Sequence, residues 1–142
     1  MADALPPPAT APLVLSARSR ELAIRWLAAA DRGDAAALIA CSHPQIAVHP
    51  TVLARGQRVY RGHDGQRAWL AHVAHAYAHH TVDVEEVRMS PDGRLLIFGR
   101  LLVDEQAVGP FSMLMTVTDG AVIETHAYLS DEAMLQTLGH LD

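Results

Sequence analysis

Three segments in the first half of the chain have apolar residues at every third or fourth position, which is the spacing of a helix with one buried face. They predict helices over residues 19–34, 35–42 and 65–79. Gly33 allows the left-handed turn that ends the first helix, and Asp34 can cap the second. The chain therefore begins with packed helices.

After residue 80, apolar and polar residues alternate, which is the period of a strand with one buried face. A shorter strand is expected at residues 45–50, a polar connection at 51–62 and a terminal helix at 130–139. The alternation itself predicts four strands joined by short turns, at residues 81–89, 93–104, 110–118 and 121–129. Helices followed by a meander of antiparallel strands predict an α+β fold.

Composition and charge narrow the class of protein. Residues 1–17 are rich in Pro and Ala and predict a disordered arm, followed by a single domain over residues 18–142. The formal net charge of −5 argues against nucleic acid or an anionic membrane as a main partner. Cys41 is the only cysteine, so no intrachain disulfide can form, and no apolar run has the length of a membrane span. We therefore expect a cytoplasmic protein.

The order of four short sequences resembles the NTF2-like superfamily, and within it the SnoaL-like polyketide cyclase and ketosteroid isomerase group. These sequences are RWLAAADRGDAAALIA, IAVHP, YRGHDGQRAWLAHV and TDGAVIETHAYLSDEAML. The resemblance covers the chain from about residue 18 onward. It implies a cone-shaped NTF2-like (cystatin-like) fold, in which N-terminal helices pack on a strongly curved antiparallel sheet and close a deep, mostly apolar pocket.

The resemblance also marks positions for catalysis. In ketosteroid isomerases the proton-shuttling aspartate precedes the proline of the IAVHP-like segment, and this position holds His49. The two positions of the oxyanion donors hold Trp26 and Met113, so the resemblance does not extend to steroid isomerisation. Imidazole is a natural general base near neutral pH, and we expect His49 in this role. The alternative is a histidine at the pocket rim that bonds to the backbone.

The last predicted strand offers a second candidate. Glu124 and His126 share one face of it, and Thr125 and Ala127 share the other. The resemblance places the Thr125 face in the pocket and the His126 face on the convex side, where this superfamily usually forms dimers. We therefore expect a homodimer through the convex face, with Leu114 among the apolar residues that it covers. A register shifted by one residue would make His126 catalytic instead.

The pocket implied by the resemblance has mainly apolar walls. A small hydrophobic molecule is the expected partner, and isomerisation, cyclisation or dehydration without a cofactor is the expected chemistry. The alternative is a non-catalytic module for ligand sensing or dimerisation. Six residues are expected to line the pocket, although plain core packing explains them equally: Trp26, Tyr77, Ile97, Phe111, Met113 and Met115.

Histidines concentrate between residues 59 and 82. His72, His75 and His79 fall within about 60° of one another on the predicted helix, at spacings that metal-binding helices also use. No carboxylate or cysteine accompanies them in the helix after Asp64, and their stripe flanks the polar face. We expect solvated histidines and no metal there, and His80 packing or capping at the helix end.

Overall fold

The computed structural model describes residues 6–50, 59–76 and 80–129, with side chains from residue 17 onward except those of residues 75 and 76. Three helices and six strands occur in these ranges. The helices are α1 (Pro6–Arg32), α2 (Ala35–Ala40) and α3 (Gly62–Ala76). The strands are β1 (Ser42–His49), β2 (Tyr60–Arg61), β3 (His80–Met89), β4 (Leu95–Val103), β5 (Gln106–Thr118) and β6 (Ala121–Tyr128).

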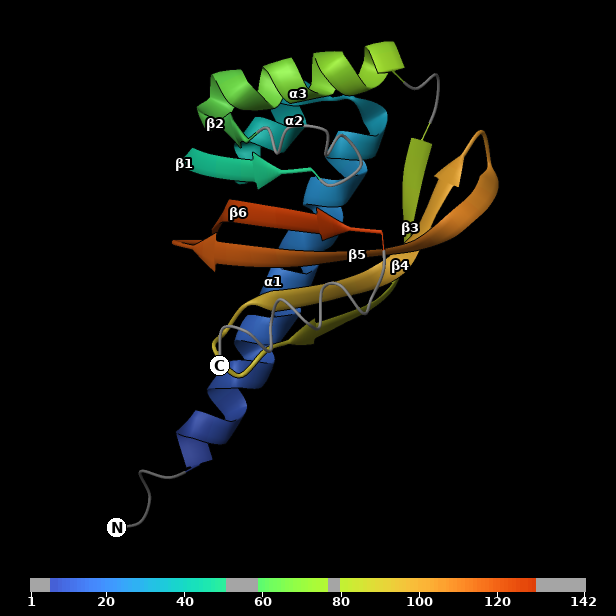
Figure 1. Cartoon of the computed structure of the whole chain (residues 1–142). Helices are drawn as coiled ribbons and strands as arrows, with labels where there is room; N and C mark the ends of the chain where they lie inside the picture. The colour runs from blue at the N-terminus through green and yellow to red at the C-terminus, as the bar shows by residue number, and fades with distance from the viewer. Residues whose placement is uncertain (1–5, 51–58, 77–79, 130–142) are drawn as a thin grey trace.

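The six strands form one curved sheet, in the order β2-β1-β6-β5-β4-β3. Irregular register within the β3–β4, β4–β5 and β5–β6 pairs marks bulges, which bend strands and increase their twist. The sheet curves around α1, and α3 lies along the end formed by β1 and β2 (Figure 1). We call the face toward α1 concave and the opposite face convex. The predicted α+β fold is confirmed.

One strand pairing differs from the predicted antiparallel meander. β1 and β6 are parallel, with Val48 opposite Thr125 and His49 opposite His126, whereas the other neighbouring strands are antiparallel. The sheet is therefore mixed. The sequence did not reveal this pairing, because a parallel pair needs a long connection and has no turn signal to mark it.

The helices also differ from their predicted bounds. α1 begins at Pro6 rather than Ser19, and its first turns project beyond the sheet (Figure 1). Residues 6–17 are thus helical here, whereas their composition predicted a disordered arm. Pro6, Pro7 and Pro8 lie in the first turn of α1, where the missing N–H of proline is not needed. α3 begins three residues before the predicted start.

The connection expected between the predicted strands 93–104 and 110–118 is mostly strand. Asp104 and Glu105 alone connect β4 to β5, and both have positive φ (52° and 67°). Two positive φ values are typical of the type I′ turn, whose twist suits a tight hairpin. β5 therefore begins at Gln106 instead of Pro110. The predicted terminal helix at 130–139 lies outside the described residues.

A buried polar network ties the helices to β1. Trp26 Nε1 on α1 donates to Ser42 Oγ (3.0 Å), and Gln66 Nε2 on α3 donates to the same oxygen (2.7 Å). Ser42 Oγ in turn donates to the Leu38 carbonyl of α2 (2.7 Å). Four elements thus meet at one hydroxyl. No helix among the described residues is long and apolar enough to cross a membrane.

Candidate functional site

A cavity of about 80 Å³ lies on the concave side of the sheet, beside α1 and α3. A single water needs roughly 10–15 Å³ on this measure, so the cavity has room for several waters or one small ligand. Trp26 of α1 and Trp69 of α3 stack at its wall with ring centroids 5.7 Å apart. Phe111 and Met113 of β5 supply the wall from the sheet. The lining is mainly apolar, as small-molecule sites usually are.

The structure places the six predicted wall residues differently. Trp26, Phe111 and Met113 line the cavity. Ile97 and Met115 are fully buried in the main core and do not line it. Met115 shares its strand face with Met113, but it lies one strand repeat further along β5, where core residues cover it. Tyr77 lies outside the described residues.

Two titratable side chains at the cavity were missed in the sequence. Asp31 lies in the last turn of α1, and its Oδ2 accepts a hydrogen bond from the Val82 backbone N–H (3.1 Å). His80, expected to pack or cap at the helix end, is instead the first residue of β3 and also lines the cavity. Val82, two residues further along β3, also lines the cavity, so Asp31 and His80 both lie beside the start of this strand. The available signal was the position of Asp31 four residues after Leu27, on the apolar stripe of the helix.

Thr125 of β6 brings a third polar group to the cavity. The side chain lines the cavity, and the residue is only 1% exposed. Its Oγ1 is buried and has no hydrogen-bond partner within the part of the chain that the structure describes. Leaving such a hydroxyl unpaired costs about 1–3 kcal/mol. Because this oxygen is buried, a polar atom of a bound molecule can reach it only if the Thr125 side chain rotates toward the cavity; that contact would remove the cost.

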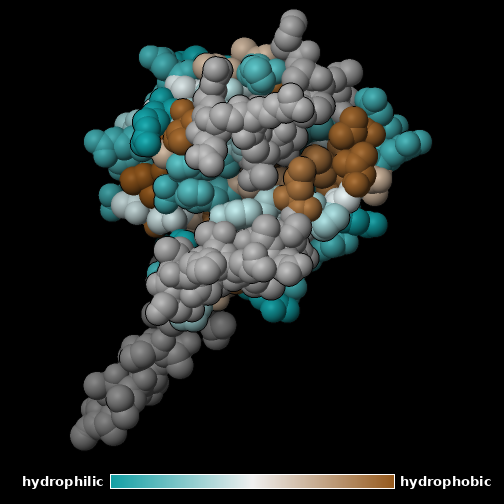
Figure 2. Space-filling view, in the orientation of Figure 1, coloured by the Kyte–Doolittle hydropathy of each residue, from teal (hydrophilic) through white to brown (hydrophobic). Residues whose placement is uncertain are grey.

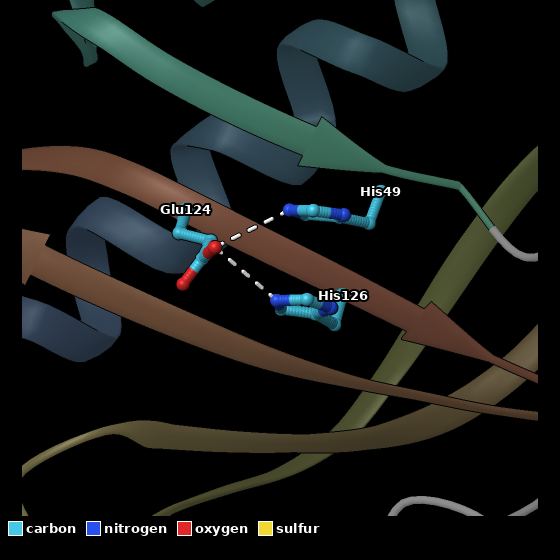
Figure 3. Close-up of side chains that lie close together, drawn as sticks. All are labelled: His49, Glu124 and His126. Carbon is cyan, nitrogen blue, oxygen red and sulfur yellow. Dashed lines mark hydrogen bonds and ion pairs between the residues drawn. The ribbon is translucent and has the colours of Figure 1, made fainter. Parts of the chain in front are cut away.

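His49, Glu124 and His126 form a second cluster, on the convex face (Figure 3). His49 Nε2 lies 3.2 Å from Glu124 Oε2, and His126 Nε2 lies 3.4 Å from the same oxygen. The two imidazole rings stack nearly parallel, with centroids 3.9 Å apart and an angle of 9° between them. The parallel β1–β6 register explains the cluster, because it sets His49 opposite His126 and Ala47 opposite Glu124.

Burial and charge set the protonation of this cluster. Burial lowers the pKa of His126 below its usual value, and the neighbouring His49 lowers it further, whereas Glu124 opposes the shift. The Arg94 cation also lowers this pKa, and it is paired with Asp92 (2.8 Å). The neutral imidazole of His126 is therefore favoured.

His49 lies at the cavity rim, as predicted, but its ring also belongs to the cluster on the convex face. It is among the cavity-lining residues, as expected for a position at the pocket rim. Its ring nevertheless stacks on His126 and bonds to Glu124 on the convex side. His126 also lies on the convex side, in agreement with the predicted register. The structure brings the two predicted catalytic histidines together and adds a carboxylate between them.

The other histidines of residues 59–82 have separate environments. His63 Nε2 lies 3.3 Å from the Ser42 carbonyl oxygen, and His72 is exposed on α3. The His75 side chain and His79 are outside the described residues. The stripe on α3 therefore shows one solvated histidine where the structure describes it.

Comparisons with known proteins define the fold but not the activity. No protein-family model and no curated protein sequence matches this chain. Solved structures do match it. TerC co-crystallized with polyporic acid is 20% identical with a TM-score of 0.67, covering 84% of this chain and 96% of that one.

Two further structures have similar shapes. An NTF2-like protein of unknown function from Burkholderia pseudomallei is 20% identical, has a TM-score of 0.66 and covers 84% of this chain and 95% of its own. A candidate polyketide cyclase from Xanthomonas campestris pv. campestris is 16% identical, has a TM-score of 0.65 and covers 85% of this chain and 96% of its own. Identities this low show a shared fold alone.

Proposed function

We propose that this chain, which has the NTF2-like fold, binds a small and largely apolar molecule in its concave cavity and performs acid–base chemistry on it. Isomerisation, cyclisation and dehydration are reactions of this kind. The observation that carries the proposal is the buried, unpaired Thr125 hydroxyl at an otherwise apolar wall. A few polar groups converging on an apolar cavity are typical of a ligand site.

Asp31 and His80 are the proposed acid and base. Both line the cavity beside its apolar wall, where one group can take a proton from a substrate carbon or hydroxyl and the other can return one. The Val82 N–H holds the Asp31 carboxylate at this wall. The sequence assigned the base to His49, but its Nε2 bonds to Glu124 on the convex side. We therefore favour the Asp31 side of the cavity.

The substrate class rests on the cavity and on the structural neighbours. The two stacked tryptophan rings offer flat apolar contacts that suit an aromatic or unsaturated molecule. One neighbour was crystallised with polyporic acid, and others are candidate polyketide cyclases. These neighbours support a small organic metabolite as the ligand.

Ligand binding without turnover is the second candidate. The mainly apolar lining supports it, because apolar walls can hold a ligand without any acid or base. Both candidates require the same binding event at Thr125. Catalysis and binding without turnover are distinguished by whether Asp31 and His80 variants lose a measurable reaction.

The homodimer through the convex face stays a proposal. Leu114 is only 2% exposed in the single chain, so it is not an uncovered apolar residue as the sequence suggested. Phe98 and Tyr128 are half-buried and pack against it. Figure 2 shows separate hydrophobic groups among hydrophilic residues on the coloured part of this side. The mixed surface weakens the argument for a large apolar interface.

Calorimetric titration tests the binding proposal, with polyporic acid as the first probe and a set of small aromatic acids after it. Thr125→Val keeps the shape of the side chain and removes its hydroxyl. The variant should bind a ligand that uses this hydroxyl about 5- to 150-fold more weakly, the equivalent of about 1–3 kcal/mol. Thr118→Val, at an exposed position on β5, is the matched control. If both variants bind the ligand as tightly as the wild type does, the Thr125 hydroxyl does not contact it, and the proposal loses its main support.

A further inference from the structure

We propose that His49, Glu124 and His126 on the convex face form a binding site for one divalent transition-metal ion, with Zn²⁺ as the ion that fits best. The three side chains meet on the convex face, and His49 also lines the rim of the cavity. The proposed site does not depend on the proposed acid–base function. The prediction of no metal from the sequence rested on His72, His75 and His79. This cluster uses a different set of residues.

Two of the three pairs of ligand atoms already have the spacing that a metal ion requires. In a tetrahedral zinc site with bonds of about 2.0–2.2 Å, neighbouring ligand atoms lie about 3.3–3.6 Å apart. The two Nε2–Oε2 distances here are 3.2 and 3.4 Å. One ligand atom from each residue lies within 4.8 Å of the other two. The stacked rings are nearly parallel, so they must tilt toward each other before both nitrogens can point at one ion.

The donor set has the right chemistry for zinc. Two imidazoles and one carboxylate, with a further position open, are the ligands of many zinc centres. Figure 3 shows both histidines turned toward the same carboxylate oxygen. The carboxylate charge offsets part of the charge of the ion. The same set also occurs around non-haem Fe(II), which binds such ligands less tightly than Zn²⁺ in the usual order of affinity.

The fold holds these residues before any ion arrives. β1 and β6 lie inside the sheet, each with a hydrogen-bonded neighbour on both sides. His49 and His126 are direct register partners, and Glu124 is two residues before His126 on the same face. Paired strands hold the backbone of a site more precisely than loops do, so only the side chains have to adjust to the ion.

The cluster is also accessible. The side chains of His49, Glu124 and His126 are 27%, 43% and 37% exposed. An ion can therefore enter from solvent, and water or a ligand can occupy the open fourth position. Within the described residues this is the one group of three or more potential ligands close enough to share an ion. The competing explanation is a surface His–Glu ion pair that binds no metal.

The test is calorimetric titration of the full, untagged chain with Zn²⁺ after chelator treatment. We expect one Zn²⁺ per chain with a Kd of about 10 µM or lower. Glu124→Gln and His126→Gln should each weaken binding by at least about tenfold, because each removes one of three ligands. Melting curves without metal check that both variants stay folded. Absence of saturable binding to the wild type would refute the proposal.

His72→Gln is the matched control, because it removes an exposed imidazole from the rival stripe on α3. It should bind Zn²⁺ as the wild type does. If His72→Gln loses binding while His126→Gln keeps it, the ion binds to the helix and the proposed site is wrong. Co²⁺ gives an independent readout, since geometry governs its visible absorption. The strong bands of a four-coordinate site should appear with the wild type and vanish with His126→Gln; a six-coordinate spectrum would contradict the tetrahedral assignment.

Discussion

Thr125 and His126 are consecutive residues of β6, and their side chains lie on opposite faces of the sheet. Thr125 lines the concave cavity, and His126 stacks on His49 on the convex face. The alternation of a strand thus separates two candidate sites by one residue. A substitution at either position should affect its own site and leave the geometry of the other largely intact.

The first prediction concerns Asp31→Asn. The amide oxygen can still accept the Val82 N–H, so the protein should fold, but the side chain can no longer exchange a proton. Turnover of an identified substrate should fall about 100- to 10,000-fold, the usual range for loss of a general acid or base. Asp119→Asn, in the exposed turn before β6, is the control and should keep full turnover. Full activity of Asp31→Asn would exclude it as the acid or base.

His49→Gln separates the two assignments of the base. We expect it to lower kcat less than Asp31→Asn does, because the His49 ring bonds to Glu124 on the convex side. The comparison requires steady-state kinetics on the same substrate for both variants. A larger loss of kcat in His49→Gln than in Asp31→Asn would identify His49 as the base, as the sequence predicted.

Much of the fold followed from local patterns. The expected helix cap at Asp34 is confirmed, because its carboxylate accepts the Ala37 N–H (3.1 Å). The alternation after residue 80 correctly placed three strands within a few residues of β3, β4 and β6. It also placed Glu124 and His126 on one face. These features depend on neighbouring residues, so a single sequence is enough to predict them.

The sites depended on contacts between distant segments. His49 and Glu124 are 75 residues apart in the chain, and only the parallel β1–β6 pairing brings them together. The bond from Val82 to Asp31 likewise joins the end of α1 to β3. Neither contact leaves a local pattern, because both are set by how whole elements pack. The sequence therefore named His49 and His126 as separate candidates and did not predict that Glu124 would contact both.

The pH dependence of stability should include a contribution from His126. Its pKa is lowered in the folded state, so the unfolded chain binds the proton more readily. This contribution is therefore constant above the unfolded pKa of about 6.5 and is lost as the pH falls from there toward the folded pKa. Urea unfolding with a chelator present should show a larger loss of stability between about pH 7.5 and 5.5 for the wild type than for His126→Gln. An identical loss in both proteins would contradict this.

The hydroxyl of Ser42 should be more important for stability than its size suggests. Ser42→Ala leaves the buried Trp26 and Gln66 donors without this acceptor, which should lower the free energy of unfolding by about 2–4 kcal/mol. Gln66→Leu should cost less, because it removes one donor together with a buried Oε1 that has no partner among the described residues. Denaturant unfolding measures both values. If Gln66→Leu lowers the free energy of unfolding more than Ser42→Ala does, Ser42 is not the shared centre of the network.

Met113→Ala tests the wall of the cavity. Met113 is 4% exposed and packs in the main core, so its truncation should cost about 2–5 kcal/mol and enlarge the cavity. Ligands with one additional ring substituent should then gain affinity relative to the wild type. Met89→Ala, on the half-buried end of β3, should cost less and leave ligand preference unchanged. Calorimetry on a homologous ligand series would show no shift in preference if Met113 were only a core residue.

The most direct test of the central claim is a crystal structure of the protein with a bound probe, starting from polyporic acid. We predict density for the probe on the concave side, with one of its polar atoms about 2.7–3.0 Å from Thr125 Oγ1 and its apolar part against Trp26 and Trp69. A probe bound outside this cavity, with the Thr125 hydroxyl still unpaired, would contradict the account.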